Sequence, residues 1–371
     1  MHAVVTGAAG FIGSHLCGYL LDLHDQVVGV DAITDYYDPE LKRRNLAQLQ
    51  GRNGFTFHQA DLTQAPLLEL FDGADVIYHL AGQPGVRASW QACFPDYLTR
   101  NILSTQAVLE TVRAHRIRKL IYASSSSVYG DALTHPTPET ARPQPVSPYG
   151  VTKLAAEHLC EVYRKAYGVP TISLRLFSVY GPHQRPDMAF SRLIAAAASG
   201  QPFSLNGDGE QTRDFTYVTD VVAAMRAAAC SDFTGITNIG GGSQTSINNV
   251  IEMLQLLAGP VEVVRHPHIK GDVRHTSADT SLARTAFGYI PGIRLAEGLA
   301  AMVAAARRFH EVAIRSCNGE PGIPQQQHCG ITPHTPHGLL LGNEQLSIDS
   351  LVTPPSADCQ DPTHDARVRR T

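Results

Sequence analysis

The sequence predicts an α/β fold, in which a doubly wound parallel sheet is joined to a smaller mixed α/β domain. Two patterns support this prediction. Short apolar runs alternate with longer amphipathic runs through the first three quarters of the 371 residues, which is typical of repeated β–α–β units. A glycine-rich turn at residues 6–13 separates the first apolar run from the first amphipathic one. A turn of this kind at this place is typical of parallel sheets that bind dinucleotides.

The elements of the main sheet are expected in the first 176 residues. Apolar runs bounded by turn residues predict six strands, at 2–6, 26–31, 55–58, 76–80, 119–124 and 171–176. Between the strands, apolar residues spaced three and four apart predict helices, for example at 105–114 and 149–166.

After residue 176 the pattern changes to turns rich in glycine and proline, followed by helical patterns at 246–258 and 295–309. The chain is expected to return to the sheet near 236–239. We therefore predict one domain from 1–176 plus about 215–245, and a second, substrate-binding domain from 177–214 and 246–310. Residues 311–371 lack periodicity and are rich in Pro, Gly, Gln and His, which predicts a disordered tail.

Charge and hydropathy exclude two classes of partner. The formal net charge is −4 and no basic face is visible in the sequence, whereas a nucleic-acid-binding domain usually concentrates Lys and Arg on one face. No run of about 18 apolar residues predicts a membrane span, and the N-terminal residues do not resemble a signal peptide. We expect no nucleic-acid or membrane partner.

The cysteines and histidines do not predict a metal site. The seven cysteines are scattered and form no Cys-x-x-Cys pair, so a reducing, cytoplasmic location is expected. A cluster of Cys and His in the tail matches no standard ligand spacing; its members are Cys317, His328, Cys329, His334 and His337.

The turn at 6–13 has the features of a dinucleotide site in a Rossmann-type sheet. Glycines there allow a tight turn and a close approach of the backbone to a pyrophosphate, which then faces the N-terminus of the next helix. The residues predicted to contact the cofactor at this turn are Gly7, Gly10, Phe11, Ile12 and Gly13.

The ends of the following strands supply the other predicted cofactor contacts. Asp31 ends the second strand, where a carboxylate accepts hydrogen bonds from the ribose 2′-hydroxyl and repels a 2′-phosphate, so the predicted cofactor is NAD rather than NADP. Asp61 and Leu62 follow the third strand, beside the expected adenine end. Residues 80–82 follow the fourth strand near the phosphates, and are Leu80, Ala81 and Gly82.

Tyr149 and Lys153 are the predicted catalytic pair. Four residues apart on a helix, they share one face. A nearby ammonium group lowers the pKa of a phenol, and the phenolate can then act as a general base on a hydroxyl group.

These motifs, with the serine-rich run at 122–130 and the Pro148–Tyr149 pair, closely resemble the extended short-chain dehydrogenase/reductase family of NAD-dependent epimerases and dehydratases. The resemblance covers residues 2–309 and leaves the tail uncovered. It implies a catalytic triad of Tyr149, Lys153 and a serine, which the spacing from Tyr129 places at Ser125, with Ser126 as the rival. It also implies a homodimer formed through the helix of Tyr149 and its neighbour.

Within the family, the chain is most similar to UDP-glucuronate 4-epimerases. Ser126 and Ser127 stand where 4,6-dehydratases have Asp-Glu, and Ser127 stands where UDP-glucuronate decarboxylases have Glu. The segments that carry the similarity are 35–46, 79–87, 176–182, 184–190, 207–215 and 271–272. The chain departs from the usual pattern at Gly82, Pro84, Ser178, Arg274 and His275.

The resemblance implies a UDP-sugar substrate. The residues expected to contact it are Ser126, Ser127, Ser178, Phe203, Leu205, Asn206, Arg213 and Asp272. A guanidinium binds a carboxylate through two parallel hydrogen bonds, so Arg185, and after it Arg87, are candidates to hold the carboxylate of a hexuronic acid. The alternative for Arg185 is a surface position or a phosphate contact.

The predicted reaction is the 4-epimerisation of UDP-glucuronate to UDP-galacturonate, by transient oxidation at C4, rotation of the 4-keto sugar and re-reduction. The alternatives are a 4-epimerase of UDP-glucose or UDP-N-acetylglucosamine, a UDP-glucuronate decarboxylase, and a non-catalytic NAD-binding sensor on the same fold. The tail could in addition bind a partner.

Overall fold

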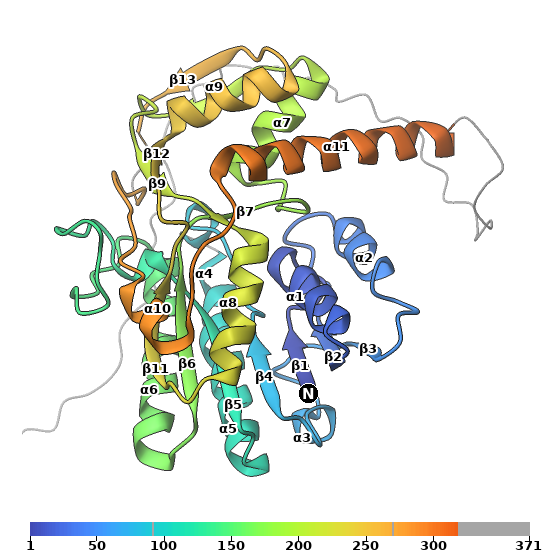
Figure 1. Cartoon of the computed structure of the whole chain (residues 1–371), viewed down its shortest axis with the longest axis vertical. Helices are drawn as coiled ribbons and strands as arrows, with labels where there is room; N and C mark the ends of the chain where they lie inside the picture. Colours follow the sequence, from blue (N-terminus) through green and yellow to red (C-terminus); the bar gives the residue numbers. More distant parts are fainter. Residues whose placement is uncertain (91–92, 269–270, 318–371) are drawn as a thin grey trace, which may run out of the picture. The chain divides into compact units, whose positions relative to one another are not determined.

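A seven-stranded parallel sheet forms the centre of the protein in a computed structural model that describes residues 1–90, 93–268 and 271–317. The strand order is β11-β6-β5-β4-β1-β2-β3 (Figure 1). The strands are β1 (His2–Thr6), β2 (Gln26–Asp31), β3 (Phe55–Gln59), β4 (Val76–His79), β5 (Lys119–Ser125), β6 (Thr171–Leu176) and β11 (Gly235–Ile239). The predicted fold class is confirmed, and each predicted strand of the sheet lies within one residue of its observed bounds.

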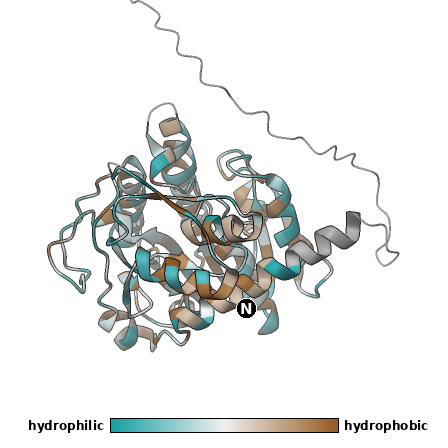
Figure 2. Ribbon diagram, turned by 90° about the horizontal axis from the view of Figure 1, so that it is seen from above, coloured by the Kyte–Doolittle hydropathy of each residue, from teal (hydrophilic) through white to brown (hydrophobic). Residues whose placement is uncertain are grey.

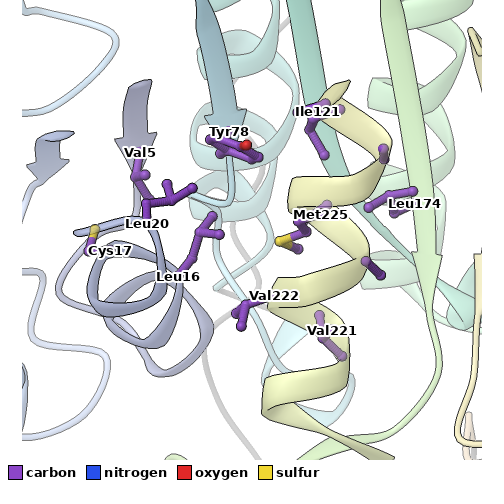
Figure 3. Packing of buried hydrophobic residues seen from close by; sticks show 14 of the residues in the cluster. Val5, Leu16, Cys17, Leu20, Tyr78, Ile121, Leu174, Val221, Val222 and Met225 are labelled. Carbon is purple, nitrogen blue, oxygen red and sulfur yellow. The ribbon is translucent and has the colours of Figure 1, made fainter. Parts of the chain in front are cut away.

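Helices cover both faces of the sheet, as its buried strands require. On one face, α1 (Phe11–Asp22) and α8 (Val218–Cys230) pack together over β1, β4, β5 and β6. Figure 3 shows Leu16 and Leu20 of α1 facing Val222 and Met225 of α8, with Tyr78 of β4 beside them. On the other face lie α5 (Ser104–His115) and α6 (Pro148–Tyr167).

A separate apolar cluster lies in the residues after β6. It joins α7 (Ala189–Ser199), α9 (Ile247–Ala258) and α11 (Leu295–Cys317) to the parallel pair β8 (Phe203–Asn206) and β13 (Val263–His266). Figure 2 shows that the helices carry both hydrophobic residues (brown) and hydrophilic residues (teal), as expected of helices with one face on a core. Most of this cluster lies in the residues predicted to form the second domain, with Phe215 and Tyr217 as exceptions.

Short elements connect these parts. They are α2 (Pro39–Ala47), α3 (Leu67–Leu70), α4 (Phe94–Tyr97), α10 (Ser281–Phe287), β7 (Val179–Tyr180), β9 (Thr212–Asp214), β10 (Thr216–Tyr217) and β12 (Gln244–Ser246). Single turns of 3-10 helix lie at Arg87–Ser89 and Ser126–Val128, and a π-helical stretch lies at Leu98–Leu103.

The start of α6 is fixed by its own sequence, and this start positions Tyr149. The Ser147 hydroxyl accepts a hydrogen bond from the Gly150 amide (3.1 Å), and Pro148 is the first helical residue, which is the favoured order at a helix N-terminus. At the other end, Gly168 adopts a left-handed conformation and ends the helix.

The boundary predicted for the tail is wrong by several residues. Helix α11 continues to Cys317, past the predicted end at 309. In the sequence the apolar residues Phe309, Val312 and Ala313 are spaced three and four apart and so extend the helical pattern. The rest of the predicted tail, with the histidines considered as metal ligands, lies outside the described residues. Within the described ranges, no helix is long and apolar enough to span a membrane, and no cluster of three or more His, Cys, Asp or Glu could hold a metal ion.

Candidate active site

Two adjoining cavities gather the predicted site residues at the carboxyl ends of the parallel strands. The main cavity has a volume of about 490 Å³ and contains the glycine-rich turn, Asp31, Tyr149, Lys153 and Arg185 in its lining. The second, of about 220 Å³, contains Arg87 and the residues of β8. Residues that line both are Ser178, Val179, Met188, Arg213 and Asp272. Every residue predicted for the cofactor, the catalysis or the substrate lines one of these cavities.

At Gly7 and Gly13 the glycine-rich turn leaves no room for a side chain. Gly7 has a positive φ of 73°, and a Cβ on it would lie 2.8 Å from the Ala81 amide nitrogen. A Cβ on Gly13 would lie 2.0 Å from the Gly7 carbonyl oxygen. Helix α1 follows with no side-chain cap at Gly10, so its first amide groups are free to bind an anion at the cavity wall. The turn therefore fits the pyrophosphate of a dinucleotide.

Asp31 is held at the end of β2 by backbone amides. Its carboxylate accepts hydrogen bonds from the amides of Ile33 (2.8 Å) and Ala9 (3.1 Å). Burial raises the pKa of Asp31, and these two hydrogen bonds and the charge of Lys42 act in the opposite direction. Asn45 holds the glycine-rich turn in place by donating a hydrogen bond to the Ala9 carbonyl (3.0 Å). This fixed carboxylate fits a ribose diol, in agreement with NAD.

Tyr149 lies beside Ser125 and within range of the charge of Arg185 in the main cavity. Burial raises the pKa of the Tyr149 phenol, whereas a hydrogen bond with Ser125 and the positive charge of Arg185 lower it. The 3-10 turn after β5 begins at Ser126, and the Ser125 hydroxyl accepts a hydrogen bond from the Ser127 amide (3.1 Å). Of the two serines left open by the sequence, the structure favours Ser125 as the partner of Tyr149.

Lys153 has a different neighbour from the one predicted. Its ammonium group lies 4.5 Å from the ring centre of Tyr122, and burial lowers its pKa to about 8. Among the described residues, the groups that lower the pKa of Tyr149 are Ser125 and Arg185, not Lys153. Because Lys153 lines the cavity and has no hydrogen-bond acceptor in the described part of the chain, it is free to bind a hydroxyl group such as those of a nicotinamide ribose.

A buried histidine, His79, lies beside Tyr122 and near Lys153. His79 bridges the hydroxyls of Thr6 (2.8 Å) and Thr105 (3.0 Å), and its ring lies 5.8 Å from that of Tyr122. Burial, with the nearby charge of Lys153, lowers the pKa of His79 to about 3, so the ring is neutral. The sequence offered one signal for it, a histidine at the end of an otherwise apolar strand.

The predicted arginines divide between the two cavities. Arg185 lines the main cavity and is paired with Asp187. Arg87 lines the second cavity, and with the Asn206 amide turned so that its oxygen faces the arginine, this oxygen accepts hydrogen bonds from Nη1 (3.0 Å) and Nη2 (2.8 Å). The structure therefore favours Arg185, and not Arg87, as the arginine near Tyr149.

Arg213 and Asp272, predicted to contact the diphosphate and the uridine ribose, lie next to each other. Arg213 forms an ion pair with Asp272, and its Nη1 also donates a hydrogen bond to the Thr212 carbonyl (2.9 Å). Both side chains line the two cavities. The pair thus lies where the cavities meet, between the catalytic end and β8.

Other lining residues were not predicted. Asn101 accepts a hydrogen bond from the Gln83 amide (2.6 Å) and donates to the Gln83 carbonyl (3.1 Å) and the Thr152 hydroxyl (3.0 Å). The position of Asn101 accounts for the glycine at position 82, because a Cβ there would lie 2.7 Å from the Asn101 amide oxygen. The remaining unpredicted residues of interest are Thr34, Tyr36, Tyr37, Lys42 and Met188.

The motifs and the geometry agree with comparisons with known proteins. Residues 3–240 match the NAD dependent epimerase/dehydratase family. The chain belongs to this family. The predicted resemblance and the predicted use of NAD are both confirmed.

Relatives of the chain within the epimerase/dehydratase family include named sugar-nucleotide epimerases. The chain is 43% identical over 306 residues to the uncharacterized UDP-glucose epimerase YtcB of Bacillus subtilis (strain 168), with 81% of this chain and 96% of that protein covered. It is 37% identical over 301 residues to a UDP-glucuronate 4-epimerase of Thermodesulfobacterium geofontis, with 80% and 93% covered.

A solved structure of a family member is also similar. It is the crystal structure of UDP-glucuronic acid 4-epimerase from Bacillus cereus in complex with UDP-glucuronic acid and NAD. The TM-score is 0.81 at 42% sequence identity, and the match covers 83% of this chain and all of that one.

Proposed function

We propose that the protein is an NAD-dependent UDP-glucuronate 4-epimerase, which interconverts UDP-glucuronate and UDP-galacturonate. The observation that carries this proposal is the position of Arg185, whose guanidinium lines the main cavity and whose positive charge opposes the rise that burial causes in the pKa of the Tyr149 phenol. A cation beside the catalytic base suits a sugar that carries a carboxylate next to the reacting carbon. The B. cereus and T. geofontis relatives support the same substrate.

In this mechanism Tyr149 removes the proton from the C4 hydroxyl of the sugar, while Ser125 holds the hydroxyl oxygen. Bound NAD supplies the acceptor, and later the donor, of the C4 hydride. Lys153 fixes the nicotinamide ribose, and the positive charge that favours the phenolate comes from Arg185. After the 4-keto sugar has turned about its diphosphate linkage, Tyr149 returns the proton to the oxygen.

Arg185 has a second task, because oxidation at C4 makes a β-keto acid. Such an acid loses CO2 when the bond to the carboxylate aligns with the carbonyl π system. Two hydrogen bonds from a guanidinium can hold the carboxylate out of that alignment. The hydroxyls of Ser126, Ser127 and Ser178 line the same cavity and can share this carboxylate.

The rest of the substrate follows the cavity lining. We propose that Arg213 binds diphosphate oxygens, that Asp272 binds the uridine ribose, and that the uracil lies in the second cavity. That cavity includes the three residues of β8 predicted for this role, Phe203, Leu205 and Asn206.

The reaction is tested by a proton NMR time course of the purified protein with UDP-glucuronate and no added NAD. We expect the spectrum of UDP-galacturonate to appear, since the cofactor is regenerated in each cycle and stays bound. Formation of UDP-xylose or a 4-keto pentose instead would assign the chain to the decarboxylases.

A neutral-sugar 4-epimerase is the second candidate, because Arg185 already has an ionic partner in Asp187 and the B. subtilis relative is named a UDP-glucose epimerase. Arg185→Ala discriminates the two. It is expected to weaken turnover of UDP-glucuronate selectively if the acid is the substrate. Turnover of UDP-glucose by the wild-type protein, with none of UDP-glucuronate, would establish the neutral-sugar reaction.

We further propose that the protein forms a homodimer through α6 and the segment before α5. Val151, Val162 and Tyr167 of α6 are 49%, 56% and 60% exposed, and Leu103 is 52% exposed. Val151 and Val162 lie eleven positions apart and therefore on the same face of the helix. Large apolar side chains on one helical face are typical of an interface.

Sedimentation equilibrium is expected to give twice the chain mass for the wild-type protein. The Val151→Asp/Val162→Asp variant is expected to sediment as a monomer, because two charges would then be buried at the interface. Leu256→Asp, at an 89% exposed residue of α9, serves as the control that should stay dimeric. A monomeric wild-type protein would contradict the proposal.

We also propose a cytoplasmic location. The cysteines Cys17, Cys93, Cys160 and Cys230 are free thiols, which is typical of proteins that work in a reducing compartment. Fractionation of the source cells, with immunodetection of the protein, tests this location.

A further inference from the structure

Arg185 is held by a carboxylate that lies behind it. Its Nε donates a hydrogen bond to Asp187 Oδ1 (3.0 Å) and its Nη2 to Asp187 Oδ2 (3.1 Å). The arginine side chain is 19% exposed and lines the main cavity, whereas Asp187 is 40% exposed and lines neither cavity. One edge of the guanidinium is thus fixed by Asp187, and in the described part of the chain Nη1 has no protein partner. This leaves the other edge available to a ligand in the cavity.

Asp187 is in turn contacted by the segment that follows the NAD-binding strand β2. The Tyr36 hydroxyl donates a hydrogen bond to Asp187 Oδ2 (3.4 Å). That segment is anchored by Lys42, whose ammonium group donates to the Thr34 carbonyl (2.8 Å) and hydroxyl (2.9 Å). Tyr36 itself lines the main cavity. Asp187 therefore connects Arg185 to the cofactor side of the site across 151 positions in sequence.

We propose that Asp187, supported by Tyr36, is a positioning residue that fixes the orientation of Arg185 and so determines whether an oxidised acid sugar is epimerised or decarboxylated. This inference rests on the proposed function. A free arginine side chain has many rotamers, and a bidentate ion pair selects the few that keep its second edge pointing at the sugar. Burial lowers the pKa of Arg185, but its hydrogen bonds to Asp187 and the charge of that carboxylate raise it above its ordinary value, which keeps the guanidinium charged.

The orientation of the carboxylate in the 4-keto sugar decides whether that sugar is decarboxylated. When the carboxylate of the 4-keto sugar aligns with the C4 carbonyl, the C5–C6 bond breaks and CO2 leaves. The electron pair of that bond forms the enolate of the C4 ketone, which takes up a proton at C5. No further oxidant is needed. A loosely held Arg185 allows this alignment, whereas a fixed one prevents it.

The test is the ratio of decarboxylated product to 4-epimer formed from UDP-glucuronate, followed by NMR for the wild-type protein and for Asp187→Ala and Asp187→Asn. Loss of a charged hydrogen bond corresponds to roughly a tenfold effect, so we expect this ratio to rise about tenfold in Asp187→Ala. Asp187→Asn, which keeps one acceptor, and Tyr36→Phe are expected to give smaller rises. Asp187→Glu, which keeps a carboxylate at this position, is expected to give a ratio close to that of the wild-type protein.

Two controls separate positioning from a structural role. Asp22→Asn breaks a similar Asp–Arg pair with Arg52 (2.6 Å) at the far end of α1, where Asp22 is 70% exposed, and should leave the product ratio unchanged. Thermal unfolding and bound NAD should be unchanged in every Asp187 variant. A fall in total turnover with an unchanged ratio in both Asp187→Ala and Asp187→Asn would overturn the inference.

Arg185→Ala distinguishes this failure from failure of the proposed function. If Arg185→Ala raises the ratio and the Asp187 variants do not, the proposed function stands and the positioning role is wrong. If the wild-type protein does not oxidise UDP-glucuronate at all, both are wrong.

Discussion

Replacing Tyr149 by phenylalanine is expected to lower the turnover number by about 10²–10⁴-fold, the usual contribution of a positioned general acid or base. Burial raises the pKa of this phenol, and its hydrogen bond with Ser125 and the charge of Arg185 act against that rise. Phenylalanine keeps the ring, whose centre lies 6.3 Å from that of Tyr97. The loss should therefore fall on turnover, with little change in the Michaelis constant or in the free energy of unfolding.

The measurement is initial-rate epimerisation of UDP-glucuronate, with thermal unfolding and bound NAD determined on the same preparation. Tyr19→Phe is the matched control, because Tyr19 lies on α1 outside both cavities and its hydroxyl has no hydrogen-bond partner among the described residues. It should keep wild-type activity. Full activity of Tyr149→Phe would show that another group removes the C4 proton, and the mechanism would be wrong.

The fold was predictable because its signals are local. Alternating strands and helices follow from hydrophobic spacing, and the turn at 6–13 needs glycine for steric reasons that apply within a few residues: Gly7 has a positive φ, and Gly13 lies against the carbonyl of Gly7. The placement of Tyr149 was equally local, since Ser147 and Pro148 determine where α6 begins. The predicted end of α11 was wrong because the change in composition that suggested the tail begins near residue 311, whereas the helix continues to Cys317.

The parts of the site that escaped prediction depend on contacts between distant residues. Asn101 is joined to Gln83 and Thr152, and Tyr36 to Asp187, only once the sheet has brought their loops together. The orientation of Lys153 toward Tyr122 depends in the same way on how α6 packs on β5. Spacing along a helix predicted that Tyr149 and Lys153 share a face. It could not show which neighbouring groups change the pKa of the Tyr149 phenol.

The second large effect is expected from a buried ion pair beneath the catalytic helix. Glu157 of α6 is fully buried and Arg175 of β6 is 3% exposed. The Glu157 carboxylate accepts hydrogen bonds from Arg175 Nη2 (2.5 Å) and Nε (3.0 Å) and from the Ser124 hydroxyl (2.8 Å). The guanidinium also lies 4.6 Å from the ring centre of Tyr129 and donates to the Glu139 carbonyl (3.2 Å). The pair thus joins α6 to β5 and β6 next to Ser125.

Arg175→Met is expected to lower the free energy of unfolding by about 3–5 kcal/mol, because it leaves the carboxylate of Glu157 buried without its counter-ion. Burial lowers the pKa of Arg175, but its hydrogen bonds to Glu157 and the charge of that carboxylate raise it above its ordinary value, so the arginine is charged in the folded state. Urea unfolding followed by circular dichroism measures the change, with the slope against urea compared to show that unfolding remains two-state.

The double variant Arg175→Met/Glu157→Leu separates the cost of a lone charge from the strength of the pair itself. Replacing a whole buried ion pair by apolar side chains of similar size is often neutral or stabilising, so the double variant should be more stable than Arg175→Met alone. Glu297→Gln, in the exposed pair with Arg294 at the start of α11, should leave the midpoint of unfolding unchanged. If Arg175→Met and the double variant lost the same stability, the loss would come from the contacts of the guanidinium with Tyr129 and Glu139, and the stranded charge would not be its cause.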